Sequence, residues 1–281
     1  MKRNILITGA NGYIGKHLVQ MLNKSNLNYN IFTLDKDGDV NFNIDVTDGL
    51  EVARVGRYLN FDTVVHLAAL VRMNESTKIP SKYYETNIIG TSNLMELINF
   101  DNFIFASTGA AENPINPYSL SKLAAEDVVR QYAETYTIFR FYNVIGVNGI
   151  APTNPDGLMY NLINAIKTGS FTLYGIDYRN ESPDGTALRE YVHVCDICRA
   201  IIKAIDKPAK RIENLAYGEP KTVLQIVNKF KEVNGVNFDV IPVSRRVGDL
   251  ESMYLMNPSS YMERNYSFEQ LLKINNDDET N

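Results

Sequence analysis

Tyr118 and Lys122 are the two side chains of this sequence best suited to moving a proton. Their spacing of four places both on one face of a helix. The phenol of tyrosine has an ordinary pKa of about 10, and a nearby ammonium together with a cationic cofactor ring can bring that pKa down toward neutrality. The pattern therefore predicts that Tyr118 is a general base and that Lys122 assists it electrostatically. Lys122 could also hold the ribose of a cofactor, although a tyrosine and a lysine at this spacing are by themselves a common surface pair.

Two hydroxyl side chains, Ser107 and Thr108, end a short apolar run that begins at Phe103. Such a run is typical of a buried strand, and open α/β sheets bind ligands at the carboxyl ends of their strands. Either hydroxyl could therefore hydrogen-bond the reacting oxygen of a substrate. The alternative, a hydroxyl that only caps a turn, is open for both residues and has more weight for Ser107.

A glycine triplet, Gly9, Gly12 and Gly15, separates the first expected strand from the first expected helix. In that setting a tight turn lets backbone N–H groups approach a pyrophosphate at the helix N-terminus. Asp35 ends the second expected strand 20 residues beyond Gly15, where a carboxylate accepts hydrogen bonds from an adenosine ribose. Because a carboxylate repels a 2′-phosphate, the pair of signals predicts NAD rather than NADP.

The elements that must position these groups alternate between strand and helix patterns. Short β-branched runs and stretches with helical periodicity take turns along the first half of the chain. This order predicts an α/β protein with a Rossmann-type, doubly wound parallel sheet. The expected strands cover 5–8, 31–34, 63–67, 103–107 and 137–141, and the expected helices 13–24, 49–59, 81–98 and 118–136.

The amino-acid composition changes after Tyr142, where Gly, Asn and Pro become frequent. A helix is expected over 158–167, a strand and helix over 192–204, and another helix over 223–233. We therefore expect an NAD-binding Rossmann domain over 1–142, to which 191–206 returns, and a smaller α/β substrate-binding C-terminal lobe over 143–281.

Composition excludes several classes of function. The chain has 281 residues, with 28 Lys and Arg against 33 Asp and Glu, and no long basic run, which argues against binding to nucleic acid. No run of about 18 apolar residues predicts a membrane span, and residues 4–8 look like a strand rather than part of a secretion signal, so we expect a cytoplasmic protein. Cys195 and Cys198 lack the second pair of a metal site and are too few for a disulfide framework; we expect structural thiols and no metal.

Further motifs extend over nearly the whole chain, and together they resemble the UDP-glucose 4-epimerase family of the extended short-chain dehydrogenase/reductase superfamily. The glycine triplet and the YxxxK pair identify only the superfamily, whereas the DGT, REYVHV and RRVGD segments are much more specific. The motifs are 8–15 (TGANGYIG), 65–69 (VHLAA), 75–76 (ES), 83–87 (YYETN), 90–91 (GT), 117–122 (PYSLSK), 141–143 (FYN), 174–178 (YGIDY), 184–186 (DGT), 189–194 (REYVHV) and 245–249 (RRVGD).

The resemblance implies a mechanism and a set of site residues. Tyr118 would take the proton of the 4-hydroxyl of a UDP-sugar while NAD⁺ takes the hydride from C4; the 4-keto sugar then rotates and receives the hydride on its other face. Thr108, Tyr118 and Lys122 would be catalytic. The NAD residues would be Gly9, Gly12, Tyr13, Ile14, Gly15, Asp35, Asp45, Val46, Leu67, Ala68, Ala69, Asn87, Ser107, Tyr118, Lys122 and Tyr142, and the substrate residues Thr108, Asn143, Leu158, Tyr174, Arg189, Arg246 and Asp249.

The resemblance also implies a homodimer through the helices 81–98 and 118–136, and tolerance of N-acetylated sugars because flexible Met253, or its neighbour Tyr254, falls near the sugar. The segment between Thr108 and Tyr118 is shorter than in typical members of the family. Val71 stands where many members have lysine, with Arg72 adjacent.

Two other functions remain open. One is a nucleotide-sugar 4,6-dehydratase, decarboxylase or reductase on the same scaffold; a dehydratase of this kind needs an acid just after the strand-end hydroxyls, and Glu112 is the nearby candidate. The other is a non-catalytic NAD-binding relative, against which the set of Thr108, Tyr118 and Lys122 argues.

Overall fold

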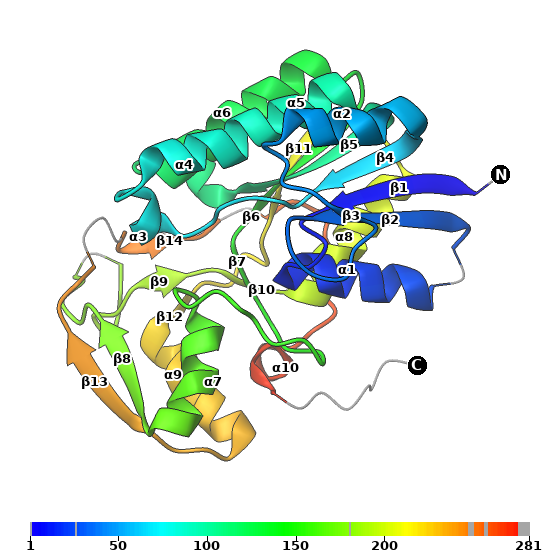
Figure 1. The fold of residues 1–281 in the computed structure, drawn as a ribbon. Helices are drawn as coiled ribbons and strands as arrows, with labels where there is room; N and C mark the ends of the chain where they lie inside the picture. The colour runs from blue at the N-terminus through cyan, green and yellow to red at the C-terminus, as the bar shows by residue number, and fades with distance from the viewer. Residues whose placement is uncertain (1, 26, 180, 247–249, 256–257, 275–281) are drawn as a thin grey trace. The chain divides into compact units, whose positions relative to one another are not determined.

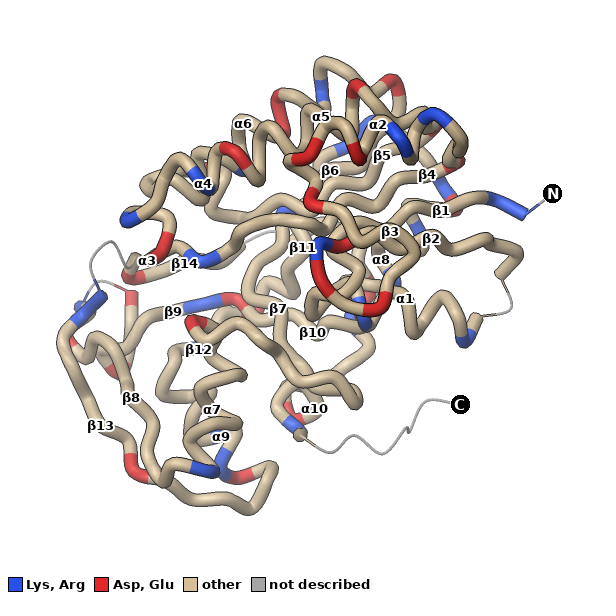
Figure 2. The backbone as a smooth tube through the Cα atoms, in the orientation of Figure 1, with Lys and Arg blue, Asp and Glu red and all other residues tan. Residues whose placement is uncertain are grey.

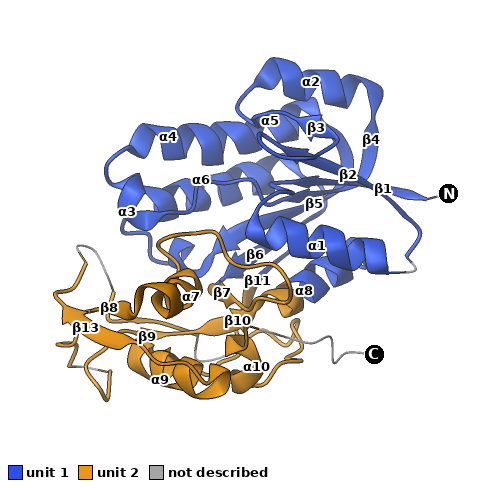
Figure 3. Cartoon of the chain, turned by 60° about the horizontal axis from the view of Figure 1, so that its bottom comes forward, with its two compact units in different colours: residues 1–141, 198–213 blue, residues 142–197, 214–281 orange. Residues whose placement is uncertain are grey.

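The computed structural model describes residues 2–25, 27–179, 181–246, 250–255 and 258–274. The chain divides into two compact units, one of residues 1–141 and 198–213 and the other of residues 142–197 and 214–281 (Figure 3). Each unit is built around its own apolar core.

A seven-stranded sheet forms the centre of the first unit, in the order β11-β6-β5-β4-β1-β2-β3. The neighbouring pairs from β6 to β3 are all parallel, and the strand order reverses direction next to β1. The strands are β1 (Arg3–Thr8), β2 (Tyr29–Asp35), β3 (Phe42–Asn43), β4 (Asn60–His66), β5 (Asn99–Thr108), β6 (Tyr136–Phe141) and β11 (Arg211–Leu215).

Helices cover both faces of this sheet, which confirms the predicted doubly wound α/β fold. In Figure 1, α2, α5 and α6 lie over one face, and α1 and α8 over the other. The helical elements are α1 (Tyr13–Lys24), α2 (Gly49–Tyr58), α3 (Met73–Ser76), α4 (Pro80–Tyr84), the π-helical turn η1 (Glu85–Ile89), α5 (Gly90–Leu97), the 3₁₀ turn η2 (Gly109–Ala111), α6 (Pro117–Tyr132) and α8 (Val194–Asp206).

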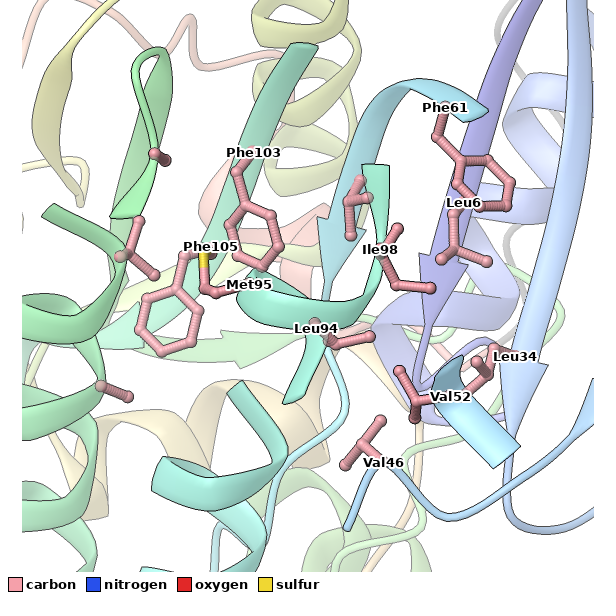
Figure 4. Packing of buried hydrophobic residues seen from close by; sticks show 14 of the residues in the cluster. Leu6, Leu34, Val46, Val52, Phe61, Leu94, Met95, Ile98, Phe103 and Phe105 are labelled. Carbon is pink, nitrogen blue, oxygen red and sulfur yellow. The ribbon is translucent and has the colours of Figure 1, made fainter. Parts of the chain in front are cut away.

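The core under α2, α5 and α6 consists of apolar side chains from both layers. Leu6 and Phe103 of the sheet pack with Val52 and Leu94 of the helices, all fully buried (Figure 4). Ile5 and Ile7, on either side of Leu6, are also fully buried, so β1 is covered on both faces. This burial explains why the strands appear in the sequence as continuous apolar runs rather than alternating ones.

The predicted helix over 81–98 is interrupted by a π-helical turn. The chain runs from α4 through η1 into α5, and Asn87 lies in the π turn with a fully buried side chain. A single π turn inside an α-helix is uncommon and is often found at functional sites.

Among its described residues, the second unit contains three small sheets and the helices α7 (Leu158–Thr168), α9 (Val223–Asn234) and α10 (Phe268–Leu272). The parallel pairs are β7 (Asn143–Ile145) with β10 (Tyr191–His193) and β8 (Ser170–Tyr174) with β13 (Asp239–Val243); β9 (Leu188–Arg189) lies between β12 (Lys221–Thr222) and β14 (Ser252–Met253). Leu162, Phe171 and Phe230 are among the residues of its core.

The segment that returns to the first unit is 198–213, which differs from the expected 191–206. The physical reason is strand pairing: β10 bonds to β7 of the second unit in register from Tyr191 opposite Asn143 to His193 opposite Ile145. None of the helices among the described residues is long and apolar enough to cross a membrane.

Candidate active site

The glycine turn between β1 and α1 has a backbone that only glycine accommodates. Gly9 has a φ of 68°, in the left-handed region, and a Cβ there would lie 2.5 Å from the backbone nitrogen of Ala68. A Cβ on Gly15 would lie 2.2 Å from the carbonyl oxygen of Gly9. The turn is therefore packed tightly between α1 and the chain that follows β4, and its backbone is accessible to a ligand without intervening side chains.

Asp35, at the end of β2, lies next to this turn as the sequence predicted. Its Oδ2 accepts a hydrogen bond of 2.9 Å from the backbone N–H of Asn11. One carboxylate oxygen thus fixes the glycine turn, and the side chain remains partly accessible. The same residue can serve the turn and a ribose, because a carboxylate accepts several hydrogen bonds.

Buried polar side chains tie the segment after β4 to the helices above it. Thr8 Oγ1 lies 2.7 Å from His66 Nδ1, and His66 Nε2 lies 3.0 Å from Thr91 Oγ1. The side chain of Asn87 accepts from Leu70 N at 2.8 Å and donates to Leu70 O at 3.0 Å. The wall formed by Leu67, Ala68 and Ala69 is therefore fixed at both ends.

Asn87 also reaches the helix that carries Tyr118. Its Nδ2 donates to Ser121 Oγ at 2.9 Å, and Ser121 Oγ donates to the Tyr118 carbonyl at 2.7 Å. The amide of Asn87, expected beside NAD, thus connects the loop after β4 with the first turn of α6.

Tyr118 lies in the first turn of α6, and local signals in the sequence fix where that helix begins. Pro117 occupies the first turn, and Asn116 and Ser119 form a capping box, each side chain bonding the other's backbone N–H. The four-residue spacing to Lys122 is realised on this helix, as predicted.

The hydroxyl of Thr108, the last residue of β5, lies near enough to the Tyr118 phenol to influence its pKa. Burial raises the pKa of the Tyr118 phenol, and the Thr108 hydroxyl opposes that rise. The lowering expected from the sequence depends on the ammonium and the cationic cofactor ring together, so it stays a prediction for the protein with bound NAD⁺. The ring of Tyr83 stands edge-on to that of Tyr118 at 6.5 Å and adds to its burial.

Lys122 is 3% exposed, and its Nζ lies 4.1 Å from the centre of the Phe105 ring. Burial lowers the pKa of this lysine to about 7, while the charge of Glu126 raises it. The side chain is therefore poised between its neutral and charged forms at neutral pH, and the face of Phe105 favours the charged form.

The two strand-end hydroxyls have different partners. Ser107 Oγ donates to Glu126 Oε1, whereas Thr108 meets Tyr118. This geometry favours Thr108 as the hydroxyl available to a substrate, because the hydroxyl of Ser107 is bonded to the Glu126 carboxylate.

Glu126 and Arg140 belong to the same cluster and were missed by the sequence reasoning. Arg140 donates to both oxygens of Glu126, from Nε at 2.9 Å and from Nη2 at 2.7 Å, and its Nη1 lies 3.3 Å from Glu112 Oε1. The available signal was a charged residue within an apolar strand together with a carboxylate one helical turn after Lys122.

In the second unit, the candidate substrate residues form hydrogen bonds with nearby backbone. Asn143 donates to the Glu190 carbonyl through both its backbone N and its Nδ2. The guanidinium of Arg189 donates to the carbonyls of Leu188 and Leu250 at 2.9 and 2.7 Å.

Arg189 pairs in register with Met253 in the β9–β14 ladder, so the two residues are neighbours on adjacent strands. The guanidinium of Arg246 lies 3.9 Å from the centre of the Tyr174 ring. Leu158 begins α7, and Asp249 lies outside the described residues.

Comparison with known proteins agrees with this architecture. Residues 5–217 match the model of the NAD dependent epimerase/dehydratase family. A UDP-glucose 4-epimerase of Pasteurella multocida is 28% identical over 323 residues, covering 96% of this chain and 95% of that protein.

Two solved structures align over 96% of both chains. The UDP-Glc/GlcNAc 4-epimerase of Campylobacter jejuni is 27% identical with a TM-score of 0.78. The UDP-glucose 4-epimerase of Bifidobacterium longum, solved in complex with NAD+ and UDP, is 25% identical with a TM-score of 0.83. With its glycine turn, its tyrosine and lysine on α6 and a family match over most of its length, the chain belongs to the NAD-dependent epimerase/dehydratase family.

Proposed function

We propose that this protein is an NAD-dependent nucleotide-sugar 4-epimerase that interconverts UDP-glucose and UDP-galactose. The observation that carries the proposal is that Tyr118 and the buried Lys122 lie four residues apart on α6, with the hydroxyl of Thr108 near the phenol. The chain is similar over most of its length to UDP-glucose 4-epimerases. Those three residues are the parts that proton removal from a sugar hydroxyl requires.

The first unit fits NAD. The cradle at Gly9 and Gly15, which any Cβ would fill, leaves backbone for a pyrophosphate, and Asp35 offers a carboxylate to the adenosine ribose. For the other NAD contacts we propose the residues that the family resemblance implies, among them Tyr13, Asp45 and Tyr142. Bound NAD⁺ would supply the acceptor for the C4 hydride and return that hydride at the end of the cycle.

The residues of this chain would remove the proton of the sugar 4-hydroxyl and return it. Tyr118 takes the proton of the sugar 4-hydroxyl and later gives it back, and Thr108 orients the phenol and the hydroxyl. The ammonium of Lys122 stabilises the phenolate, which burial would otherwise disfavour. Because proton and hydride both return, the sugar is isomerised without net oxidation.

The second unit would hold the UDP part of the substrate. Guanidinium groups suit diphosphate oxygens, so Arg189 and Arg246 are proposed for this task, together with Asn143, Leu158, Tyr174 and Asp249. A firmly held nucleotide leaves the hexose free to rotate, as an epimerase requires.

The dehydratase alternative receives less support from the structure. Its candidate acid, Glu112, is engaged by Arg140 in an ion pair of 3.3 Å. The non-catalytic alternative is opposed by the presence of Tyr118 and Lys122 on one helix with the Thr108 hydroxyl near the phenol.

A cytoplasmic location is proposed as well. It rests on the two buried thiols, Cys195 and Cys198, which fit a reducing compartment.

Replacing Tyr118 by phenylalanine tests the catalytic assignment. Wild-type protein is expected to convert UDP-galactose to UDP-glucose, and Tyr118→Phe to reduce turnover by about 10²-fold or more, because a positioned base contributes about that much. NAD binding, measured by calorimetry, should be retained. Near-normal turnover in Tyr118→Phe would remove this residue from the mechanism, and a wild-type protein with no epimerase activity would overturn the proposed function.

Asp35 is expected to determine the choice between the two dinucleotides. Wild-type protein should bind NAD more tightly than NADP, because the carboxylate repels the 2′-phosphate. Asp35→Asn removes the charge, so it should reduce the difference in affinity between NAD and NADP. Because asparagine keeps an acceptor for Asn11 N–H, it should disturb the glycine turn less than Asp35→Ala does. Calorimetric titration with both dinucleotides measures this, and a wild-type protein that binds NADP at least as tightly contradicts it.

The N-acetylated sugars are expected to be accepted to some extent. Met253 is flexible and beside Arg189, and the similar Campylobacter jejuni protein is a UDP-Glc/GlcNAc 4-epimerase. The ratio of kcat/KM for UDP-galactose to that for UDP-N-acetylgalactosamine should stay below about 10⁴. A larger ratio would mean that a rigid group closes the space around C2.

A homodimer is proposed through α4, η1, α5 and α6. These elements run side by side in Figure 1 and carry both signs of charge in Figure 2. Large apolar side chains are exposed along them, as expected of a surface that a second copy covers about a two-fold axis. They are Ile79, Tyr84, Ile89, Leu120 and Tyr132.

Light scattering on the full chain tests the dimer. The wild-type mass at micromolar concentration should be twice 31.7 kDa, and Ile89→Glu should lower it toward the monomer value. Leu50→Glu is the matched control, because Leu50 is more exposed but lies on α2, and it should leave the mass unchanged. A monomeric wild-type protein would refute the proposed interface.

A further inference from the structure

The side chain of Glu126, in the middle of α6, is fully buried. Burial of a charged carboxylate costs free energy unless the group is paired and hydrogen-bonded. Glu126 lies four residues after Lys122, so the two side chains are neighbours on one face of the helix. Its oxygens accept from Ser107 Oγ, Arg140 Nε and Arg140 Nη2. The carboxylate is thus held by one hydroxyl and by two nearly parallel guanidinium bonds.

We infer that Glu126 is a positioning residue that keeps Lys122 in its charged form, and that Ser107 and Arg140 hold its carboxylate in place for this task. The inference deepens the proposed function, since it concerns how the charge beside Tyr118 is maintained. It assigns no contact between Glu126 and a ligand.

A purely structural reason for this ion pair is weak. A buried pair of opposite charges is often no more stabilising than apolar side chains of the same size, because both charges lose their hydration. Glu126 has no exposed surface, and the Arg140 side chain is 17% exposed. What the pair adds beyond packing is a fixed dipole whose negative end, the Glu126 carboxylate, belongs to a residue one turn from Lys122.

The surroundings of Lys122 show why that charge matters. On α6 it faces Tyr118 and Glu126, on β4 His66, on β5 the ring of Phe105, and β6 contributes Arg140 behind Glu126. His66 is neutral, because burial and the charge of Lys122 both lower its pKa.

Tyr118 is also neutral, because burial raises its pKa. Within the described part of the chain, Glu126 is thus the carboxylate that counteracts the burial of Lys122, whose pKa is already down to about 7.

The sign of the expected change follows from these charges. Removing the negative charge of Glu126 disfavours the ammonium, so the pKa of Lys122 must fall. Glu126→Gln also leaves the positive charge of Arg140 without its main partner, which acts in the same direction. The ammonium that is needed beside Tyr118 would then be lost at a lower pH, and the alkaline limb of the pH profile would move down.

Glu112 provides a matched control. Its Oε1 bonds the same Arg140 at 3.3 Å, from a half-exposed position on the short segment after β5. Glu112→Gln removes one carboxylate from the same guanidinium without touching the helix face of Lys122. A general effect of disturbing Arg140 would appear in both variants, whereas an effect on Lys122 would appear only at Glu126.

The test is an NMR pH titration of the full chain with ¹³C-labelled lysine, in which the Lys122 signal is identified by its loss in Lys122→Arg. Glu126→Gln should lower the titration midpoint of Lys122 by about one pH unit or more, as expected for a neighbouring charge in a buried site. Glu112→Gln should leave the midpoint in place, and Glu126→Asp, which keeps the charge, should restore most of it. The alkaline limb of kcat/KM should move in parallel.

A folded Glu126→Gln protein with an unchanged Lys122 midpoint overturns the inference, even if its activity falls. Should that variant fail to fold, the double variant E126M/R140M replaces both charges with apolar side chains. Because Glu126 is the charge that acts on the pKa of Lys122, the midpoint should still fall, though by less than in Glu126→Gln, and a midpoint that does not fall overturns the inference. The titration needs no substrate, so it separates this inference from the proposed function: absent epimerase activity in the wild type would refute the function and leave the titration interpretable.

Discussion

The burial of charged and polar groups beneath α6 is the constraint on which this site depends. The helix must pack closely against β5 to complete the core, yet the same face carries Tyr118, Lys122 and Glu126. Each of these groups loses hydrating water on packing and has a protein group beside it instead. The Thr108 hydroxyl lies near the phenol, and the ring of Phe105 lies against the ammonium. Arg140 and Ser107 donate hydrogen bonds to the carboxylate. Where these groups are buried, as Lys122 and Glu126 are, each remaining charge has a stronger effect.

The same need to satisfy buried polar groups fixes the geometry around the dinucleotide cradle. Thr8, His66 and Thr91 form one buried hydrogen-bonded chain, and the side chain of Asn87 binds the loop after β4 and Ser121. Asn87 lies in the π turn η1, and Thr91 Oγ1 donates to its backbone carbonyl at 2.7 Å. The strand before the glycine turn and α6 are therefore connected by one hydrogen-bonded set of residues.

In the second unit, the cations are arranged in another way. Arg246 stacks on Tyr174, Arg245 stacks on Tyr178 and bonds Asp177, and Arg189 donates to backbone carbonyls. Stacking and planar donation orient a guanidinium without neutralising it. The ring of Tyr174 thus orients the guanidinium of Arg246, whereas the charge of Arg245 is balanced by Asp177.

The sequence by itself determined the order of strands and helices, the position of the glycine turn, the place of Asp35 beside it and the alignment of Tyr118 with Lys122. These features depend on local rules: apolar runs, glycine where a Cβ would collide, a helix start at Asn116 and Pro117, and a spacing of four. Tertiary structure alone decided that the helix over 81–98 contains a π turn and that β10 pairs with β7. It also decided that Ser107 bonds Glu126 while Thr108 lies near Tyr118, and that burial raises the pKa of Tyr118. The reason is that hydration and hydrogen-bond partners depend on residues far apart in the chain, such as Arg140 and Glu126 or Asn87 and Leu70, whose meeting no local pattern encodes.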